Sequence, residues 1–383
     1  MKGERALVLT TDVFMKGGVQ RYSRGVVDAI RHIAGEEAVS VFVVNRPDTR
    51  QFETSIDVDY VGGGTGWVAK ARYGLRVLGW VARHRGDLGL VWCAHLHLGP
   101  LGAVAARLSG CPYVVNAFGH EIWSRMSPLR RRALVNADRV VSDCHFTAGY
   151  IEENFPIEPK RVRVNWDPVD LERFRPLEEV APAKVLGELS VTVNDRTHLL
   201  LTLGRLDRGA RHKGYDRIIE LMTELEASGC EYIIAGEGDD RRRLEQKVRD
   251  LGLERCVHFT GEVDERDLCR VYNCADLFVL VSDRGENRGE GIPLTPLEAQ
   301  ACGVPAVVGD EDGSQEAVVD GETGFIVSPR DRTSIYQAIR KFCGDGLMQV
   351  RMGESARELV EERFSRRAFR ERTAEIVGEV CGT

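Results

Sequence analysis

Short apolar runs alternate with helix-forming segments along most of this 383-residue chain. The first run is residues 6–10, a helical pattern follows over residues 20–32, and a further helical pattern over residues 68–83 precedes a similar apolar run at residues 88–92. Apolar runs without polar alternation are typical of strands that are buried on both faces of a parallel sheet. The alternation restarts at residues 198–203 and continues to residues 324–327. The pattern therefore predicts two doubly wound α/β domains.

Length, charge and cysteine content limit the class of protein. The length suits about two domains of ordinary size. The net charge of −7 argues against a general nucleic-acid-binding protein. The ten cysteines form no CxxC pair and no cysteine–histidine cluster with zinc spacing, so we expect reduced thiols in a cytoplasmic protein. The polar start is not a signal peptide, and no apolar run approaches the roughly 20 residues of a membrane span.

The most informative stretch is Gly289–Pro305, in which seven residues separate Glu290 from Glu298. Its glycines and prolines predict a loop over residues 290–295 and a short helix over residues 296–302. A loop that runs into a helix N-terminus presents unpaired backbone N–H groups, which suit a phosphate. Glu298, just inside the helix, can accept hydrogen bonds from a pair of hydroxyls. Glu290, on the loop, can meet the other end of the same ligand.

The residues after Glu298 extend this pattern. They run Ala299-x-Ala301-Cys302-Gly303-x-Pro305 and then Gly313-x-x-Glu316-x-Val318-x-Asp320-Gly321-x-x-Gly324-Phe325. The whole succession resembles the donor site of family 4 retaining glycosyltransferases with the GT-B fold. The resemblance covers nearly the whole chain and is strongest over residues 213–324. It implies two Rossmann-like domains that face an interdomain cleft.

The resemblance also divides the chain. We expect an N-terminal Rossmann-like acceptor-binding domain over residues 1–176 and a linker over residues 177–196. A C-terminal Rossmann-like domain over residues 197–360 is expected to bind the nucleotide sugar. Residues 361–383 are expected to form a helix that packs back on the first domain.

Two basic residues follow the first strand of the second half. Gly204 and Arg205 end that strand, and Lys213 comes after a polar loop. An arginine can hold phosphate oxygens through two N–H groups, and a lysine supplies a compact charge. Gly-Arg followed by Lys-Gly is similar to the family pattern. It implies that Gly204, Arg205 and Lys213 bind the donor diphosphate.

The resemblance assigns further donor contacts to the central loop. Glu290 is expected to bind hydroxyls of the donor sugar, and Glu298 is expected to bind the ribose. The remaining loop contacts are expected from Gly291, Ile292, Pro293, Leu294 and Thr295. Pro293 stands where glycine is frequent in the family and removes one N–H group near the sugar.

Gly17 and Gly18 lie in the loop between the first expected strand and the first expected helix. Glycines let a ligand approach the backbone closely. The resemblance places this loop over the donor phosphates. A plain strand-to-helix turn is the alternative interpretation.

Phe118-Gly119-His120-Glu121 follows a buried strand of the first half. Much of the family has His-Gly-x-Asp/Glu here, with that histidine near the reacting sugar. Gly119 and Glu121 match this pattern, whereas Phe118 takes the histidine position. His120 is therefore a candidate catalytic residue, and the alternative is that no histidine acts there.

We expect no metal ligands and no cofactor other than the donor substrate itself. His95 and His97 follow a strand two residues apart, which is weak evidence for a metal, and a contribution to the acceptor site stays open. Asp310-Glu311-Asp312 matches Asp-x-Asp, but it lies where the family has a variable turn.

The resemblance implies a retaining, metal-independent mechanism with Arg205, Lys213, Glu290 and His120 as catalytic residues. Departure of the nucleotide places negative charge on the β-phosphate, which cations and backbone N–H groups stabilise. Attack by the acceptor on the same face retains the configuration, and the departing phosphate serves as the base.

Arg125 and the run Arg130, Arg131 and Arg132 form a basic cluster on or near a helix. A solvated helix face is one interpretation, and contact with an anionic lipid or a pyrophosphate-bearing acceptor is the other. The expected partners are thus a nucleotide sugar and a glycan, lipid-linked or small-molecule acceptor, but no nucleic acid. Peripheral membrane contact stays open.

Two other functions remain open. A nucleotide-sugar 2-epimerase of related two-domain shape would lack the run over residues 290–324. A non-catalytic nucleotide-sugar-binding protein would keep the fold, and Phe118 is the residue that most favours it.

Overall fold

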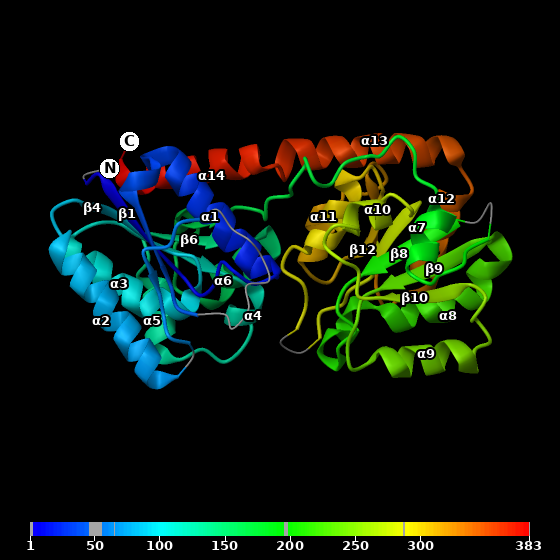
Figure 1. Cartoon of the computed structure of the whole chain (residues 1–383), viewed down its shortest axis with the longest axis horizontal. Helices are drawn as coiled ribbons and strands as arrows, with labels where there is room; N and C mark the ends of the chain where they lie inside the picture. Colours follow the sequence, from blue (N-terminus) through cyan, green and yellow to red (C-terminus); the bar gives the residue numbers. More distant parts are fainter. Residues whose placement is uncertain (1–2, 46–55, 65, 195–197, 286–287, 383) are drawn as a thin grey trace. The chain divides into compact units, whose positions relative to one another are not determined.

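The computed structural model describes residues 3–45, 56–64, 66–194, 198–285 and 288–382. The chain folds into two units (Figure 1). One unit combines Met1–Pro168 with the C-terminal segment Arg366–Thr383, and the other spans Val169–Ser365.

These boundaries differ from those expected from the sequence. The segment over residues 177–194, expected to be a linker, belongs to the second unit, and residues 195–196 lie outside the described residues. Helix α7 (Pro182–Glu188) lies in this segment and buries Val185 and Leu186. Apolar side chains of this kind hold the segment to the unit that buries them.

The first unit contains, among the described residues, a seven-stranded parallel sheet with the order β3-β2-β1-β4-β5-β6-β7. Its strands are β1 (Arg5–Thr10), β2 (Val39–Val43), β3 (Tyr60–Val61), β4 (Leu88–Cys93), β5 (Tyr113–Ala117), β6 (Arg139–Ser142) and β7 (Val162–Val164). Strand order reverses between β1 and β4. Doubly wound sheets bind ligands beyond the C-terminal ends of the strands at such a switch point.

The α-helices of the first unit are α1 (Gly18–Ala34), α2 (Trp67–Arg83), α3 (Gly99–Ser109), α4 (Gly119–Ile122), α5 (Pro128–Val135), α6 (His145–Asn154) and α14 (Arg366–Cys381). Its short 3-10 helices are η1 (Glu36–Ala38), η2 (Leu96–Leu98) and η3 (Pro159–Arg161).

Alternate residues of β1 pack against opposite layers of helices, as the two-residue period of a strand requires. Ala6 and Val8 belong to a buried apolar cluster with α1 and α14. Leu7 and Leu9 belong to a second cluster with α2 and α3. Figure 1 shows these two helix pairs on the two sides of the sheet.

Helix α14 carries the C-terminal segment onto the first unit. Phe369 is 1 % exposed and lies edge-on to Tyr22 of α1, with ring centroids 5.2 Å apart. Ile376 and Val377 are buried in the same cluster. The last helix therefore completes one face of a sheet whose strands begin near residue 5.

The second unit contains, within the part of the chain that is described, a six-stranded parallel sheet with the order β10-β9-β8-β11-β12-β13. Its strands are β8 (His198–Leu203), β9 (Cys230–Ala235), β10 (Val257–Gly261), β11 (Leu277–Leu280), β12 (Ala306–Gly309) and β13 (Gly324–Val327). Its switch point lies between β8 and β11. The prediction of two doubly wound α/β domains is confirmed.

The remaining helices of the second unit are α8 (Tyr215–Leu225), α9 (Arg241–Asp250), α10 (Leu268–Tyr272), α11 (Leu294–Ala301), α12 (Arg332–Cys343) and α13 (Gly346–Arg363), with the short 3-10 helices η4 (Arg208–Lys213), η5 (Glu226–Ser228) and η6 (Gly313–Ala317). All ten cysteines are free thiols. No helix among the described residues combines the length and the apolar character needed to cross a bilayer.

Candidate functional site

The charged residues singled out in the second half gather at the switch point of the second sheet. Strand β8 ends at Leu203 and continues into Gly204 and Arg205, and η4 then ends at Lys213. The neighbouring strand β11 leads towards the loop that carries Glu290. The topology therefore places this loop at the edge of the sheet where ligands of this architecture bind.

Glu290 lies at the centre of a charged cluster. Its Oε1 accepts a hydrogen bond from Lys213 Nζ at 2.6 Å and lies 2.9 Å from His212 Nε2. Its backbone N–H donates to Asp312 Oδ2 at 2.9 Å, and its carbonyl accepts from Gly313 N–H at 3.1 Å. The carboxylate is thus positioned through both its side chain and its main chain.

The cluster also fixes the charge of Glu290. Its side chain is only 19 % exposed. Burial alone would raise the pKa of Glu290, but the Lys213 ammonium and the His212 ring outweigh this effect and hold the pKa well below its usual range. The ionised carboxylate can only accept hydrogen bonds, which suits a partner with hydroxyl groups.

Gly204 leaves space for the lysine. A Cβ atom at residue 204 would lie 3.6 Å from Lys213 Cδ and 2.9 Å from Tyr215 Oη. The second separation is shorter than ordinary van der Waals contact, so a side chain here would push Tyr215 aside. Gly204 therefore lies beside Lys213, and the close approach of Tyr215 Oη explains why a residue without a side chain is needed here.

Arg205 lies apart from the charged cluster. Its side chain is 82 % exposed, and its Nη1 is 3.4 Å from Asp207 Oδ2. An exposed ion pair of this length holds a side chain only weakly. The structure therefore brings Lys213 and Glu290 together and leaves the Arg205 guanidinium in solvent.

The helix that carries Glu298 begins two residues earlier than predicted. Leu294 is its first residue, and Pro293 is the extended residue that precedes it. The prediction started the helix at Pro296, which instead lies in its first turn. A proline fits there because the first N–H groups of a helix have no partner within the helix.

The other loop residues of the prediction precede or open this helix. Gly291 is half-buried, and Ile292 and Pro293 are buried. Leu294 and Thr295 are half-buried at the start of α11. Their backbone N–H groups lie at the positive end of the helix dipole.

Glu298 is buried in α11, with 3 % of its surface exposed. The Tyr272 hydroxyl donates to Glu298 Oε2 at 2.7 Å, so α10 orients this carboxylate. The hydrogen bond is stronger than one between two neutral groups because the acceptor is a carboxylate.

Sequence reasoning missed three residues that build this site. His212 directly precedes Lys213, and apart from this neighbour no sequence pattern marked it as a site residue. Asp312 was considered for its Asp-x-Asp match, whereas the structure uses it to hold the Glu290 backbone. Tyr272 is 26 positions from Glu298, and no local pattern connects them.

In the first unit, Gly17 and Gly18 lie at the entrance to α1. Gly17 has a φ of 142°, which side chains rarely allow, and α1 begins at Gly18. The loop therefore has the glycine-dependent geometry that the sequence indicated. Phosphate binding by these glycines stays a prediction.

The histidine position of the family is filled by a core residue. Phe118 is 4 % exposed and packs edge-on against Tyr22, with ring centroids 5.2 Å apart. The exposed His120 has its ring centroid 6.0 Å from that of His95. Partial burial lowers the pKa of His120, and the charge of Glu121 opposes this effect.

The basic cluster lies in and beside α5. Arg125, Arg131 and Arg132 are exposed, and Arg130 is half-buried. Leu129 on the same helix is 69 % exposed. Basic and apolar side chains that are exposed together suit an anionic surface, and membrane contact stays a prediction.

Two protein-family models match this chain. The model for glycosyl transferases group 1 matches residues 190–359, and the model for glycosyltransferase family 4 matches residues 16–173. The chain belongs to glycosyltransferase family 4. These matches confirm the family resemblance that the motif over residues 290–324 indicated for this glycosyltransferase.

Relatives of the glycosyltransferase agree with this assignment. It is 29 % identical over 281 residues to the GDP-mannose-dependent alpha-(1-6)-phosphatidylinositol monomannoside mannosyltransferase of Mycolicibacterium smegmatis, a match that covers 72 % of each chain. Its structure resembles that of HepE from Anabaena in complex with UDP (TM-score 0.79, 18 % identity, 98 % of this chain and 100 % of the other). Sucrose-phosphate synthase from Thermosynechococcus elongatus is also similar (TM-score 0.75, 20 % identity, 99 % of each chain). The glycosyltransferase has the GT-B fold.

Proposed function

We propose that this enzyme transfers a sugar from a nucleotide-diphosphate sugar to an acceptor with retention of configuration and without a metal ion at the diphosphate. The observation that carries the proposal is the 2.6 Å contact of Lys213 with Glu290 beside the start of α11. A cation and a carboxylate meet there, and the carboxylate lies a few residues before the N-terminus of a helix, whose first N–H groups have no partner within the helix. The Mycolicibacterium relative is named as GDP-mannose-dependent and the Anabaena structure as a UDP complex, which supports a nucleotide-sugar donor.

Lys213 suits the diphosphate of a nucleotide sugar, and Glu290 suits its sugar. The Lys213 ammonium has three N–H donors, so it can keep its bond to Glu290 and still donate to phosphate oxygens. Glu290 can accept hydrogen bonds from sugar hydroxyls, because it is ionised. Arg205 is exposed and can turn towards the same phosphates, where its planar fork matches their oxygens. Glu298, oriented by Tyr272, is assigned to the ribose.

The proposed reaction breaks the bond between the anomeric carbon and the phosphate oxygen. The electron pair moves onto the β-phosphate, where Lys213, Arg205 and the N–H groups at the start of α11 stabilise the new charge. The acceptor hydroxyl oxygen bonds to the anomeric carbon on the face that the nucleotide leaves. Its proton passes to the departing phosphate, so no side-chain base is required.

The first unit supplies the remaining proposed contacts. The Gly17 and Gly18 amides are assigned to the donor phosphates on the family resemblance. His120, one residue past Gly119, is assigned to the reacting sugar in place of the family histidine, whose position Phe118 takes. Arg125, Arg130, Arg131 and Arg132 are assigned to a glycan or lipid-linked acceptor that carries negative charge. The named lipid acceptor of the Mycolicibacterium relative supports this acceptor class.

One observation favours a second function. The buried Phe118 in place of a catalytic histidine is compatible with a protein that binds nucleotide sugars without transferring them. A 2-epimerase has no specific observation in its support.

Thermal shift with a panel of nucleotide sugars identifies the donor, because a ligand that binds only the folded form raises the melting temperature. Release of nucleotide diphosphate is then measured with and without candidate acceptors. A transferase releases it faster with the correct acceptor. Donor binding without release supports the binding protein, and an epimerised donor sugar supports the 2-epimerase.

A further inference from the structure

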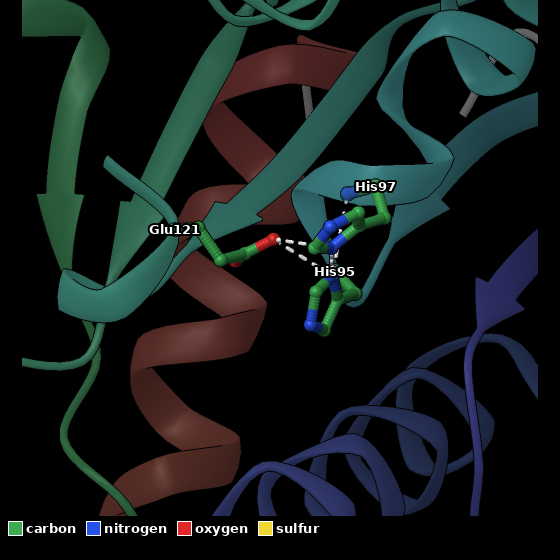
Figure 2. A group of neighbouring side chains, drawn as sticks. All are labelled: His95, His97 and Glu121. Atoms are coloured by element: carbon green, nitrogen blue, oxygen red, sulfur yellow. Dashed lines mark hydrogen bonds and ion pairs between the residues drawn. The ribbon is translucent and has the colours of Figure 1, made fainter. Parts of the chain in front are cut away.

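Three side chains with metal-ligand chemistry converge in the first unit (Figure 2). His95 follows β4, His97 lies in η2, and Glu121 lies in α4 directly after β5. Strands β4 and β5 are adjacent and parallel, so their C-terminal ends bring these residues together. His95 Nδ1 lies 2.7 Å from Glu121 Oε1, His97 Nδ1 lies 3.3 Å from the same oxygen, and the two Nδ1 atoms are 2.9 Å apart.

One buried oxygen of this group accepts no hydrogen bond of normal geometry from the described residues. The His97 backbone N–H donates to His95 Nδ1 at 3.2 Å, which requires a lone pair on that nitrogen. The same nitrogen is 2.7 Å from the buried oxygen, Glu121 Oε1. A ring nitrogen and a carboxylate oxygen this close need a positive centre between them, which is either a proton on the ring or a bound cation.

We propose that His95, His97 and Glu121 form a binding site for a divalent transition-metal ion of the zinc class. Zinc takes histidine nitrogen and carboxylate oxygen at about 2.0–2.2 Å, and two histidines with one glutamate are an established open zinc ligand set. Tetrahedral ligands at that distance are roughly 3.3–3.5 Å apart. The three separations of 2.7, 2.9 and 3.3 Å reach this with small outward movements.

A neighbouring backbone group and burial position the proposed ligands. The other carboxylate oxygen of Glu121 accepts a hydrogen bond from the Phe118 N–H at 3.2 Å, which turns Oε1 towards the histidines. Such contacts to the far side of a ligand orient it and raise metal affinity. The side chains of His95 and Glu121 are 9 % and 2 % exposed, whereas that of His97 is 44 % exposed. His95 and Glu121 are therefore buried, whereas His97 leaves the site open to solvent.

The proposed ion differs from one that would hold the donor diphosphate, because the proposed reaction places no metal there, although His120 adjoins the site. The sequence predicted no metal ligand here because a histidine pair two residues apart is common by chance. The third ligand comes from a different strand end, 24 residues beyond His97, as the sequence numbering shows.

Zinc binding by the full chain tests the proposal. Protein treated with a chelator and kept reduced is titrated with Zn²⁺ in competition with a chromophoric chelator. We expect one tightly bound ion per chain. His97→Ala, at an exposed position, and Glu121→Gln, which keeps the side-chain shape, are each expected to weaken binding by about 100-fold or more, since even loss of an indirect partner costs 10–100-fold.

His32→Ala is the matched control, because His32 is exposed on α1 away from the cluster. It is expected to leave affinity unchanged. The Co²⁺-loaded protein is expected to lack the near-ultraviolet band of a cobalt–thiolate bond, which separates this site from the ten free cysteines. The proposal is overturned if no ion binds tightly or if the cobalt-loaded protein shows a thiolate band. It is also overturned if the wild-type protein and the folded His97→Ala protein bind zinc with equal affinity.

Discussion

Lys213 Nζ lies 2.6 Å from Glu290 Oε1, although 77 positions separate the two residues in the chain. The pair is held between the end of η4 and the loop before α11, with side chains 14 % and 19 % exposed. It joins the residue assigned to the donor phosphate with the residue assigned to the donor sugar. Most of the functional account depends on this relationship.

Replacing Lys213 with alanine is expected to lower kcat/KM by about 100-fold or more. Loss of one preorganised donor to a developing negative charge typically has this effect. The measurement is release of nucleotide diphosphate from the donor found by the thermal-shift screen. Lys184→Ala, at an exposed position of α7, is the control and is expected to keep full activity. A folded Lys213→Ala protein with wild-type kcat/KM would contradict the assigned role.

Replacing Glu298 with alanine is expected to weaken donor binding by about 10–100-fold, because a hydrogen bond to a charged group contributes about 1.5–3 kcal/mol. Tyr272→Phe removes only the hydroxyl that orients Glu298 Oε2, so a smaller loss of affinity is expected. Calorimetric titration with the nucleotide diphosphate measures both variants. The assigned ribose role is wrong if Glu298→Ala binds the ligand as tightly as the wild-type protein.

Asp240 is expected to make stability depend on acid pH. It is 3 % exposed, and hydrogen bonds from Arg243 and then Arg211 hold its pKa well below the usual range. The unfolded chain therefore binds this proton more tightly than the folded chain. The resulting stabilisation is fully present above the unfolded pKa of about 3.9 and is lost as the pH falls towards the folded pKa.

Asp240→Asn is accordingly expected to lower the free energy of unfolding by about 2–3 kcal/mol at neutral pH. The difference from the wild-type protein is expected to shrink as the pH falls below about 4. Urea unfolding followed by circular dichroism at several pH values measures this. Glu322→Gln, at an exposed position, is the control. A difference that stays constant across this range would refute the assignment.

The C-terminal helix is expected to stabilise the first unit. Phe369→Ala leaves a cavity beside Tyr22 and is expected to cost about 3–5 kcal/mol of unfolding free energy. The five tryptophans all lie between residues 67 and 166, so their fluorescence in urea reports on this unit. Arg367→Ala, whose side chain is 76 % exposed on the same helix, is expected to have little effect. Equal unfolding midpoints for both variants would show that α14 does not support the first unit.

The fold was predictable because its signals are local. Apolar runs such as residues 198–203 mark the buried strands, and the Glu290 to Gly324 motif marks the family. The start of α11 was placed two residues late, since Pro296 is tolerated throughout the first helical turn and does not fix the boundary.

The contacts that the sequence did not predict depend on which strands and helices lie side by side. His95 and Glu121 meet because β4 lies beside β5, and no pattern near either residue records that contact. Tyr272 meets Glu298 through the packing of α10 on α11 in the same way. Arg205 was grouped with Lys213 by its chemistry and by the family pattern, its side chain is 82 % exposed, and its role at the phosphate stays a prediction.

A crystal structure with the donor nucleotide diphosphate bound tests the central claim most directly. The account predicts β-phosphate oxygens within about 2.7–3.2 Å of Lys213 Nζ and of the Arg205 guanidinium. The start of α11 is expected to point at the same phosphate. A pyrophosphate bound elsewhere, with Lys213 still engaged only with Glu290, would contradict it.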